Sequence, residues 1–242
     1  MWPNGKKWVY SISYDEGCEL LLKNVLPIHR ELNIPGHISV VAKEVGKKKE
    51  SPHSSFYGMK ILNRDQIFSL REEGWGISCH SMTHTRITEK NAKEEVIKSK
   101  LLLEKLLGID INIFCVPADN RSYYPALNLA RRNYKAIMTI YDKVNHYDGD
   151  LMRLGRVALH DRYPFPFYSE FDPYKRIHQA IDQNGWIIDY CHIPMEVPIH
   201  LEKDCSLNQL VQRFEKIIEI GKNNVWLAEI GEVIDYISTK KR

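Results

Sequence analysis

The sequence predicts a single α/β domain in which about seven or eight strand–helix units form a closed or nearly closed barrel. Its 242 residues lie within the range of single α/β barrels, roughly 200–250 residues. Short apolar or alternating segments, typical of strands, take turns with segments whose apolar residues repeat at helical spacing. This alternation implies parallel strand–helix–strand units, and no linker interrupts it. Residues 1–242 are therefore expected to form one domain.

The N-terminal half contains three predicted strands and three predicted helices. Residues 7–14 alternate large apolar side chains with small or polar ones, as a strand requires, and residues 18–30 carry apolar side chains along one helix face. Asn63, followed by Gln66 three positions later, is a capping-box pattern at a helix start. Gly108 follows the longest helix as a stop signal. The remaining predictions are strands at 37–41 and 75–79, a long surface loop to residue 57, and helices at 63–73 and 88–107.

The C-terminal half continues the same alternation. Each expected strand is a short apolar run, and each expected helix is longer, with charged residues between its apolar ones. No internal sequence repeat is visible, so the repetition is one of architecture. We expect strands at 111–116, 136–140, 154–160, 186–192 and 225–227, and helices at 125–132, 173–183, 207–220 and 229–238.

Composition and charge exclude several classes of protein. Hydrophobic residues make up 43% and charged residues 27% of the chain, which is typical of globular domains. No run of about 18 apolar residues predicts a membrane span. The net charge is only +3, and we interpret the basic runs 47–49 and 240–242 as solvated. Neither nucleic acid nor a membrane is therefore an expected partner, and the oligomeric state is left open.

The five cysteines and the N-terminus indicate a reducing compartment. An odd number of cysteines without C-x-x-C spacing favours reduced thiols over a disulfide framework. The first residues lack the pattern of a signal peptide and lead directly into the first strand. We therefore expect a cytoplasmic protein, with a leader removed from this chain as the alternative. Four cysteines fall beside expected strand ends, where buried thiols are expected and soft metal ligands are the alternative: Cys18, Cys79, Cys115 and Cys191.

His80 and His84 form the most informative local pattern. They lie in His-Ser-Met-Thr-His, directly after the strand expected at 75–79. Two imidazoles four positions apart on one turn can reach a single cation. Isolated pairs of this kind also occur as ordinary surface or core histidines. Their interpretation as metal ligands therefore depends on further groups on the same face.

Two other expected strands end in groups that suit the same site. Asp15 and Glu16 follow the first strand, and Gly17 permits a tight turn there, while His192 ends the strand at 186–192. In a barrel of parallel strands, the C-terminal strand ends share one face. Adjacent carboxylates point in different directions, so one can bind a cation while the other acts as a base. Three strand ends together therefore predict one site with metal ligands and a general base.

The order of these motifs resembles that of the polysaccharide deacetylase family, the NodB-homology carbohydrate esterases. The family's aromatic-Asp-Asp-Gly motif is matched by Tyr-Asp-Glu-Gly at 14–17, and its His-Ser/Thr-x-x-His motif by residues 80–84. Its apolar strand that closes with His is matched by residues 186–192, and its last strand and helix are similar to residues 225–237. The resemblance therefore spans nearly the whole chain.

This resemblance implies a distorted (β/α) barrel and metal-assisted hydrolysis of an acetyl group from a sugar or glycan. Matched position by position, it implies that Asp15 is the general base, that His192 is the general acid, and that the N–H of Ala118 binds the oxyanion. The implied cofactor is a divalent metal, with zinc expected first and iron, cobalt or manganese as alternatives. The metal ligands are matched by Glu16, His80 and His84.

Two positions depart from the family's pattern. Glu16 stands where the family has Asp, and its extra methylene must shift either the cation or the start of the next helix. The Arg-x-Pro motif is present only as Cys-Val-Pro at 115–117, so Cys115 replaces the arginine that pairs with the base. We predict that Arg156 takes over this role, because a guanidinium holds a carboxylate through two parallel hydrogen bonds. Arg121 is the alternative.

Three functions are compatible with the sequence. The first is a metal-dependent deacetylase of N- or O-acetylated sugars or glycans. The second is a small-molecule amidohydrolase, because Trp-Pro-Asn-Gly at 2–5 is similar to intracellular members of the allantoinase-like branch. The third is an inactive carbohydrate-binding relative, suggested by Cys115. Expected substrate contacts are Pro117 and aromatic residues that either stack on sugar rings or pack in the protein: Tyr123, Tyr124, Tyr163, Phe165, Phe167 and Tyr168.

Overall fold

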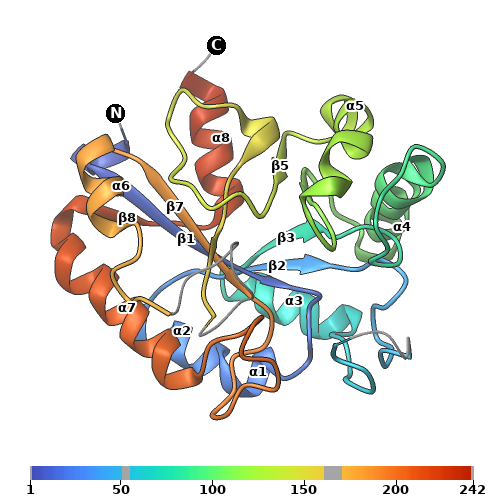
Figure 1. The fold of residues 1–242 in the computed structure, drawn as a ribbon, viewed down its shortest axis with the longest axis horizontal. Helices are drawn as coiled ribbons and strands as arrows, with labels where there is room; N and C mark the ends of the chain where they lie inside the picture. The colour runs from blue at the N-terminus through green and yellow to red at the C-terminus, as the bar shows by residue number, and fades with distance from the viewer. Residues whose placement is uncertain (1, 51–54, 161–170, 241–242) are drawn as a thin grey trace.

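The computed structural model describes residues 2–50, 55–160 and 171–240. In these ranges parallel strands form one curled sheet in the order β5-β4-β3-β2-β1-β7-β6, with β8 beside β1. Helices surround the sheet (Figure 1). The strands are β1 (Trp8–Asp15), β2 (His37–Val40), β3 (Gly76–Cys79), β4 (Ile113–Cys115), β5 (Ala136–Met138), β6 (Val157–Ala158), β7 (Trp186–Cys191) and β8 (Val225–Leu227).

The helices follow the predicted ranges with three differences, the first being that the helix expected at 173–183 begins only at Ile177. The segment 18–30 forms two helices, because Pro27 has no N–H with which to extend the first one. The segment 88–107 begins with a π-helical turn at Lys93–Lys98. No helix in the described ranges has both the length and the apolar character needed to cross a membrane. The helices are α1 (Leu21–Asn24), α2 (Leu26–Leu32), α3 (Arg64–Glu72), α4 (Ser99–Leu107), α5 (Tyr123–Asn133), α6 (Ile177–Gln183), α7 (Leu207–Gly221) and α8 (Ile230–Lys240), with short 3-10 turns at Pro3–Gly5, Asn120–Ser122, Leu151–Arg153 and Lys222–Asn224.

Strand β1 lies in the middle of the sheet and positions the first site residues. It pairs with β7 along nearly its whole length, while its other edge pairs with β8 near its start and with β2 at its end. All eight of its residues are buried, as expected for a parallel strand that is covered on both faces. Asp15, its last residue, therefore enters the C-terminal end of the barrel from the middle of the sheet.

The two ends of the sheet are joined between β5 and β6. Leu154 forms a parallel bridge with Met138, and its carbonyl accepts a hydrogen bond from the N–H of Thr139. This contact curls the sheet into a distorted, nearly closed barrel. The predicted α/β barrel is therefore confirmed.

The strand expected at 154–160 is much shorter than predicted. Only Val157–Ala158 pairs with β7. The backbone N–H of Arg156 donates to the carbonyl of Tyr141 instead of joining the ladder. The strand therefore begins only after Arg156, whose buried side chain contacts Asp15.

A buried ion pair also lies in the core, away from the strand ends. Arg213 of α7 donates to both carboxylate oxygens of Asp189 in β7, over 2.8 and 3.2 Å. The hydroxyl of Tyr10 donates to the same carboxylate. Neither charged side chain is exposed to solvent. Arg213 and Asp189 therefore form a buried ion pair that is not part of a strand end.

Candidate active site

A cavity of about 440 Å³ lies at the C-terminal ends of the strands. Barrels of parallel strands place their active sites at this end, where the strand-to-helix loops converge. The cavity is also lined by residues that the sequence analysis did not select, among them Glu44, Lys49 and His160. Six residues predicted for the site line it: Asp15, Glu16, His80, His84, Ala118 and His192.

Asp15 is held by the guanidinium of Arg156 through two parallel hydrogen bonds. One nitrogen, Nη1, lies 2.7 Å from Oδ1, and the other, Nη2, lies 3.0 Å from Oδ2. Arg156 also donates to the hydroxyl of Ser13 and to the carbonyl of Thr139. Its side chain is completely buried. The structure thus places Arg156 where a replacement for the family's arginine was expected, and its effect on catalysis stays a prediction.

These contacts decide the charge state of Asp15. Burial favours the neutral acid, but the charge of Arg156, the nearby imidazole of His80 and the hydrogen bonds from Arg156 favour the carboxylate more strongly. They hold the pKa of Asp15 well below its ordinary value. The side chain is therefore ionised across the neutral pH range, as a general base must be.

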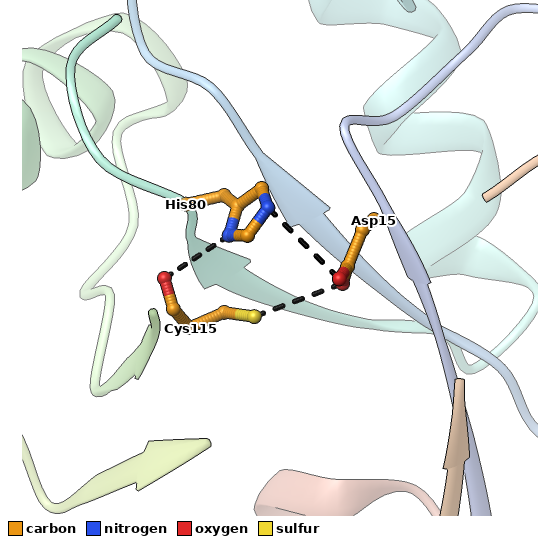
Figure 2. Close-up of side chains that lie close together, drawn as sticks. All are labelled: Asp15, His80 and Cys115. Atoms are coloured by element: carbon orange, nitrogen blue, oxygen red, sulfur yellow. Dashed lines mark hydrogen bonds and ion pairs between the residues drawn. The ribbon is translucent and has the colours of Figure 1, made fainter. Parts of the chain in front are cut away.

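Side chains from the ends of β1, β3 and β4 meet at Asp15, as Figure 2 shows. Nδ1 of His80 donates to the carbonyl of Cys115 over 3.0 Å, and Nε2 lies 3.9 Å from Oδ2 of Asp15. The thiol of Cys115 donates to Oδ1 of Asp15 over 3.7 Å. Burial raises the pKa of this thiol well above its ordinary value, which keeps it protonated. Cys115 therefore acts here as a weak hydrogen-bond donor.

The two carboxylate oxygens of Glu16 face different groups, one an imidazole and the other an ammonium group. Oε1 lies 3.7 Å from Nε2 of His84, and Oε2 contacts Nζ of Lys49. The same ammonium lies 2.9 Å from Glu44. Burial opposes the charge on Glu16, but His84 and Lys49 outweigh it and lower its pKa to about 2. Glu16 is therefore an ionised carboxylate at neutral pH.

Lys49 is a site residue that sequence analysis assigned to a solvated basic run. Lys47 and Lys48 are exposed, as expected, but Lys49 is only 3% exposed. The expectation was wrong for Lys49 because its ammonium pairs with the carboxylates of Glu16 and Glu44 at the cavity. Two carboxylates, Glu16 and Glu44, compensate its buried charge. Both are separated from it by intervening chain, so the lysine run itself gave no signal of them.

The loop at residues 80–84 is organised by Glu95, which sequence analysis also missed. This carboxylate is 3% exposed and lies in the π-helical turn, an irregularity common at functional sites. It accepts hydrogen bonds from the backbone N–H groups of Met82 and Thr83 and from the hydroxyls of Thr83 and Thr85. A single buried carboxylate thus fixes the loop that carries both histidines.

Replacing Glu95 by Gln is expected to lower the free energy of unfolding by about 1–3 kcal/mol, because an amide leaves some of these buried donors without an acceptor. Urea unfolding measures the effect. Glu94→Gln is the matched control, since its carboxylate pairs with the exposed Lys43 and Lys98 and its loss should change stability by less than about 0.5 kcal/mol. Equal stability of the two variants would contradict this role of Glu95.

Backbone strain gathers around the cavity. Four residues other than glycine have left-handed backbone on these loops, namely Glu16 (φ 70°), Ser81 (φ 70°), His84 (φ 59°) and Ala118 (φ 63°). Such conformations cost roughly 1–3 kcal/mol each and cluster at sites where the surrounding structure enforces them. The loops are therefore held in shapes that their local sequence disfavours.

His192 follows β7 and is oriented by the segment that precedes α7. Its Nδ1 donates to the carbonyl of Lys203 over 3.1 Å, and its backbone N–H donates to Asp204 over 2.6 Å. Burial raises the pKa of Asp204 to about 6, although His192 and backbone N–H groups favour its charge. Since Nδ1 is occupied, Nε2 is the ring nitrogen of His192 that is left for a group in the cavity.

The predicted substrate contacts are placed differently from the catalytic candidates. Pro117 and Tyr123 are buried, Tyr124 is exposed, and none of the three is among the residues that line the cavity. Arg121, the alternative partner of Asp15, pairs with Asp119 and is 72% exposed. Four of the predicted aromatic contacts lie outside the described residues: Tyr163, Phe165, Phe167 and Tyr168.

All five cysteines fall within the described ranges, and each is buried and free. Cys79 donates to the hydroxyl of Ser99, and Cys18 contacts the sulfur of Met59. Burial raises the pKa of Cys18 to about 11. Protonated, enclosed thiols of this kind match the expected structural role.

The donor set at the cavity has the protonation states that a divalent metal requires. Burial lowers the pKa of His80 to about 3 and also lowers that of His84, although nearby carboxylates oppose both shifts. Two neutral imidazoles and the ionised Glu16 are suitable metal ligands. The carbonyl on Nδ1 of His80 is the outer partner that metal-binding histidines commonly have. The chemistry of these residues therefore fits a divalent cation.

The candidate metal ligands do not all lie close to one another, although their protonation states suit a cation. Among the described residues, the trio whose ligand atoms all lie within 4.8 Å of one another is Asp15, His80 and Cys115. Glu16, His80 and His84 do not form such a trio, and the carboxylate of Glu16 is bound to Lys49 instead. Lys49 therefore already occupies one carboxylate oxygen of the candidate metal ligand Glu16.

A curled parallel barrel with two adjacent carboxylates and two histidines at its C-terminal face is the arrangement expected of NodB-homology proteins. A family model described as polysaccharide deacetylase matches residues 3–137, which is more than half of the chain. The chain therefore belongs to the polysaccharide deacetylase family, as the order of its motifs indicated. A comparison with curated protein sequences finds no significant match.

Solved structures of similar proteins share the fold. A candidate polysaccharide deacetylase from Mycobacterium smegmatis is 17% identical, with a TM-score of 0.64 over 100% of this chain and 93% of that one. A family 4 acetyl xylan esterase from Clostridium thermocellum, solved with a cobalt ion, is 14% identical, with a TM-score of 0.55 over 94% and 91%. A peptidoglycan deacetylase from Bacillus subtilis is 14% identical, with a TM-score of 0.54 over 100% and 95%. At these identities the likeness establishes a common fold.

Proposed function

We propose that this chain is a metal-dependent hydrolase that removes acetyl groups from N- or O-acetylated sugars or glycans. The observation that carries the proposal is the ionised Asp15, held by Arg156 beside two neutral histidines in one cavity. Family membership supports the reaction class. The names of the similar structures, a xylan esterase and a peptidoglycan deacetylase, support a carbohydrate substrate.

Glu16, His80 and His84 would hold the divalent cation. Zinc is our first expectation, with iron, cobalt or manganese as alternatives, because imidazole and carboxylate ligands suit all four. When bound, such a cation polarises the acetyl carbonyl and lowers the pKa of water. The cobalt ion bound by the similar esterase supports a metal ion as the cofactor.

Asp15 acts as the general base in this proposal. It takes a proton from the water whose oxygen attacks the acetyl carbon. Arg156 keeps the carboxylate charged and fixes its direction, since both carboxylate oxygens are held in the plane of the guanidinium. Positioning of this kind lowers the entropic part of the barrier.

His192 acts as the general acid. Its Nδ1 is held by the carbonyl of Lys203, so a proton on Nε2 can pass to the leaving nitrogen or oxygen of the sugar. The bond between the acetyl carbon and that atom breaks, and acetate and the deacetylated sugar are released. Ala118 lines the cavity, and its N–H would stabilise the negative charge that develops on the carbonyl oxygen.

The geometry also bears on the other two functions. An inactive binding protein was suggested by Cys115, but Arg156 supplies the pairing that Cys115 lacks, which favours catalysis. A small-molecule amidohydrolase would use the same residues and would differ in its substrate. The choice of substrate therefore distinguishes a small-molecule amidohydrolase from a deacetylase.

The test combines acetate release with elemental analysis of the purified protein. We expect acetate from N-acetylated amino sugars, their oligomers or O-acetylated xylo-oligosaccharides, and about one divalent metal ion per chain. The double variant His80→Ala/His84→Ala should lose both, because it removes two ligands. His146→Ala/His178→Ala is the matched control, since both histidines are exposed and outside the cavity.

Two other results would change the assignment. Hydrolysis of cyclic ureides or other small amides without acetate release from sugars would favour the amidohydrolase. No hydrolysis, with equal metal content in the wild type and the ligand variant, would overturn the proposal.

A further inference from the structure

Lys49 contributes a positive charge inside the proposed metal site. Its ammonium contacts Oε2 of Glu16 and lies 2.9 Å from Oε2 of Glu44. The side chain is 3% exposed, and its backbone N–H and carbonyl bond to Met59 and Gly58. The position of the ammonium is therefore fixed from both ends of the side chain.

Glu16 is the shared element between Lys49 and the histidines. Its second oxygen, Oε1, faces Nε2 of His84 at 3.7 Å. A carboxylate can bind a cation through one oxygen while the other accepts a hydrogen bond. With Oε2 held by Lys49, Glu16 has one oxygen left for a metal ion.

The charge of Lys49 acts against a divalent cation at this place. Like charges repel, and the repulsion is screened less here than at the surface because the side chain of Lys49 is 3% exposed. Without Lys49, however, the buried Glu16 and the half-buried Glu44 would lie close together without a cation between them, which is itself unfavourable. A lysine between them balances the metal-free site and competes with the metal.

We propose that Lys49 is a built-in counter-cation, which occupies one oxygen of Glu16 and limits how tightly the site binds a divalent metal. The inference rests on the proposed function, because it takes Glu16, His80 and His84 as the metal ligands. It explains why the chain combines a glutamate with a buried lysine at this site. The longer side chain of Glu16 reaches both the lysine and His84.

The dissociation constant for Zn²⁺, measured by competition with a chromophoric chelator, tests this role. Lys49→Met is expected to bind Zn²⁺ at least about tenfold more tightly than the wild type, because a buried positive charge is removed next to the ligand. Lys49→Arg keeps the charge and should stay within about threefold of the wild type. Lys48→Met is the matched control, since it removes the same charge from an exposed neighbour and should change nothing.

A second pair of measurements guards against a folding defect. Lys49→Gln removes the charge but keeps a polar group that can bond to the carboxylates, so it should fold and bind more tightly as well. Zn²⁺ should also raise the unfolding temperature of the neutral variants more than that of the wild type, since a tighter ligand stabilises the folded state further.

The two proposals fail in different ways. If the wild type and His84→Ala bind Zn²⁺ equally well, the metal site itself is wrong. If His84→Ala binds more weakly but both Lys49→Met and Lys49→Gln bind no more tightly than the wild type, the role of Lys49 is overturned and the metal site stands.

Discussion

Asp15→Asn is expected to lower acetate release by roughly 10³-fold, because an amide cannot accept the proton of the attacking water. The variant should still bind its divalent metal, since Glu16, His80 and His84 are intact. Measured kcat/KM and metal content together show whether the loss is chemical. Circular dichroism confirms that the variant is folded.

The core provides the matched control for this substitution. Asp189→Asn makes the same change in a buried aspartate that is also paired with an arginine, but Asp189 does not line the cavity. It should lose stability and keep its activity once folded. Substantial turnover by Asp15→Asn would exclude Asp15 as the base and would leave Glu16 as the carboxylate to test.

Arg156→Met is expected to affect both stability and catalysis. It leaves the carboxylate of Asp15 buried without its partner, which should lower the free energy of unfolding by about 3–5 kcal/mol. Because Arg156 holds the pKa of Asp15 low and catalysis needs the ionised form, its loss should raise that pKa. The acidic limb of the kcat/KM profile should therefore move to higher pH.

The lowered pKa of Asp15 should also make the free energy of unfolding of the wild type depend on pH. A carboxyl whose pKa is lowered by folding stabilises the native state fully above its unfolded pKa of about 4, and this contribution is lost as the pH falls further. Arg156→Met should remove much of this acid-dependent part. Denaturant unfolding between about pH 2 and 6 measures it.

Arg213→Met separates the catalytic effect of Arg156 from its structural one. Both arginines are completely buried and bind both oxygens of an aspartate. Arg213→Met should therefore destabilise the protein to a similar degree while leaving the pH profile in place. If the acidic limb of Arg156→Met coincides with that of the wild type, Arg156 does not set the pKa of the base.

The sequence by itself determined the barrel and the arrangement of the strand-end motifs. Alternating strand and helix periods are local properties, so they could be assigned without any knowledge of distant contacts. The same holds for Asp15, His80 and His192, which each end or follow a strand. Because parallel strand ends share one face of a barrel, residues at the strand ends could be assigned to one site from the sequence alone.

Only the tertiary structure decided how these groups are supported. Arg156 and Arg121 were both candidates for pairing with Asp15, and burial of the first and exposure of the second distinguish them. In the sequence, Lys49 cannot be told from a solvated lysine, because its partners Glu16 and Glu44 come to lie beside it only in the folded chain. Glu95 had no recognisable motif, because its partners are backbone N–H groups and hydroxyls of a separate loop. Contacts of this kind depend on which loops converge and which charges lose access to water, and neither property is encoded in local periodicity.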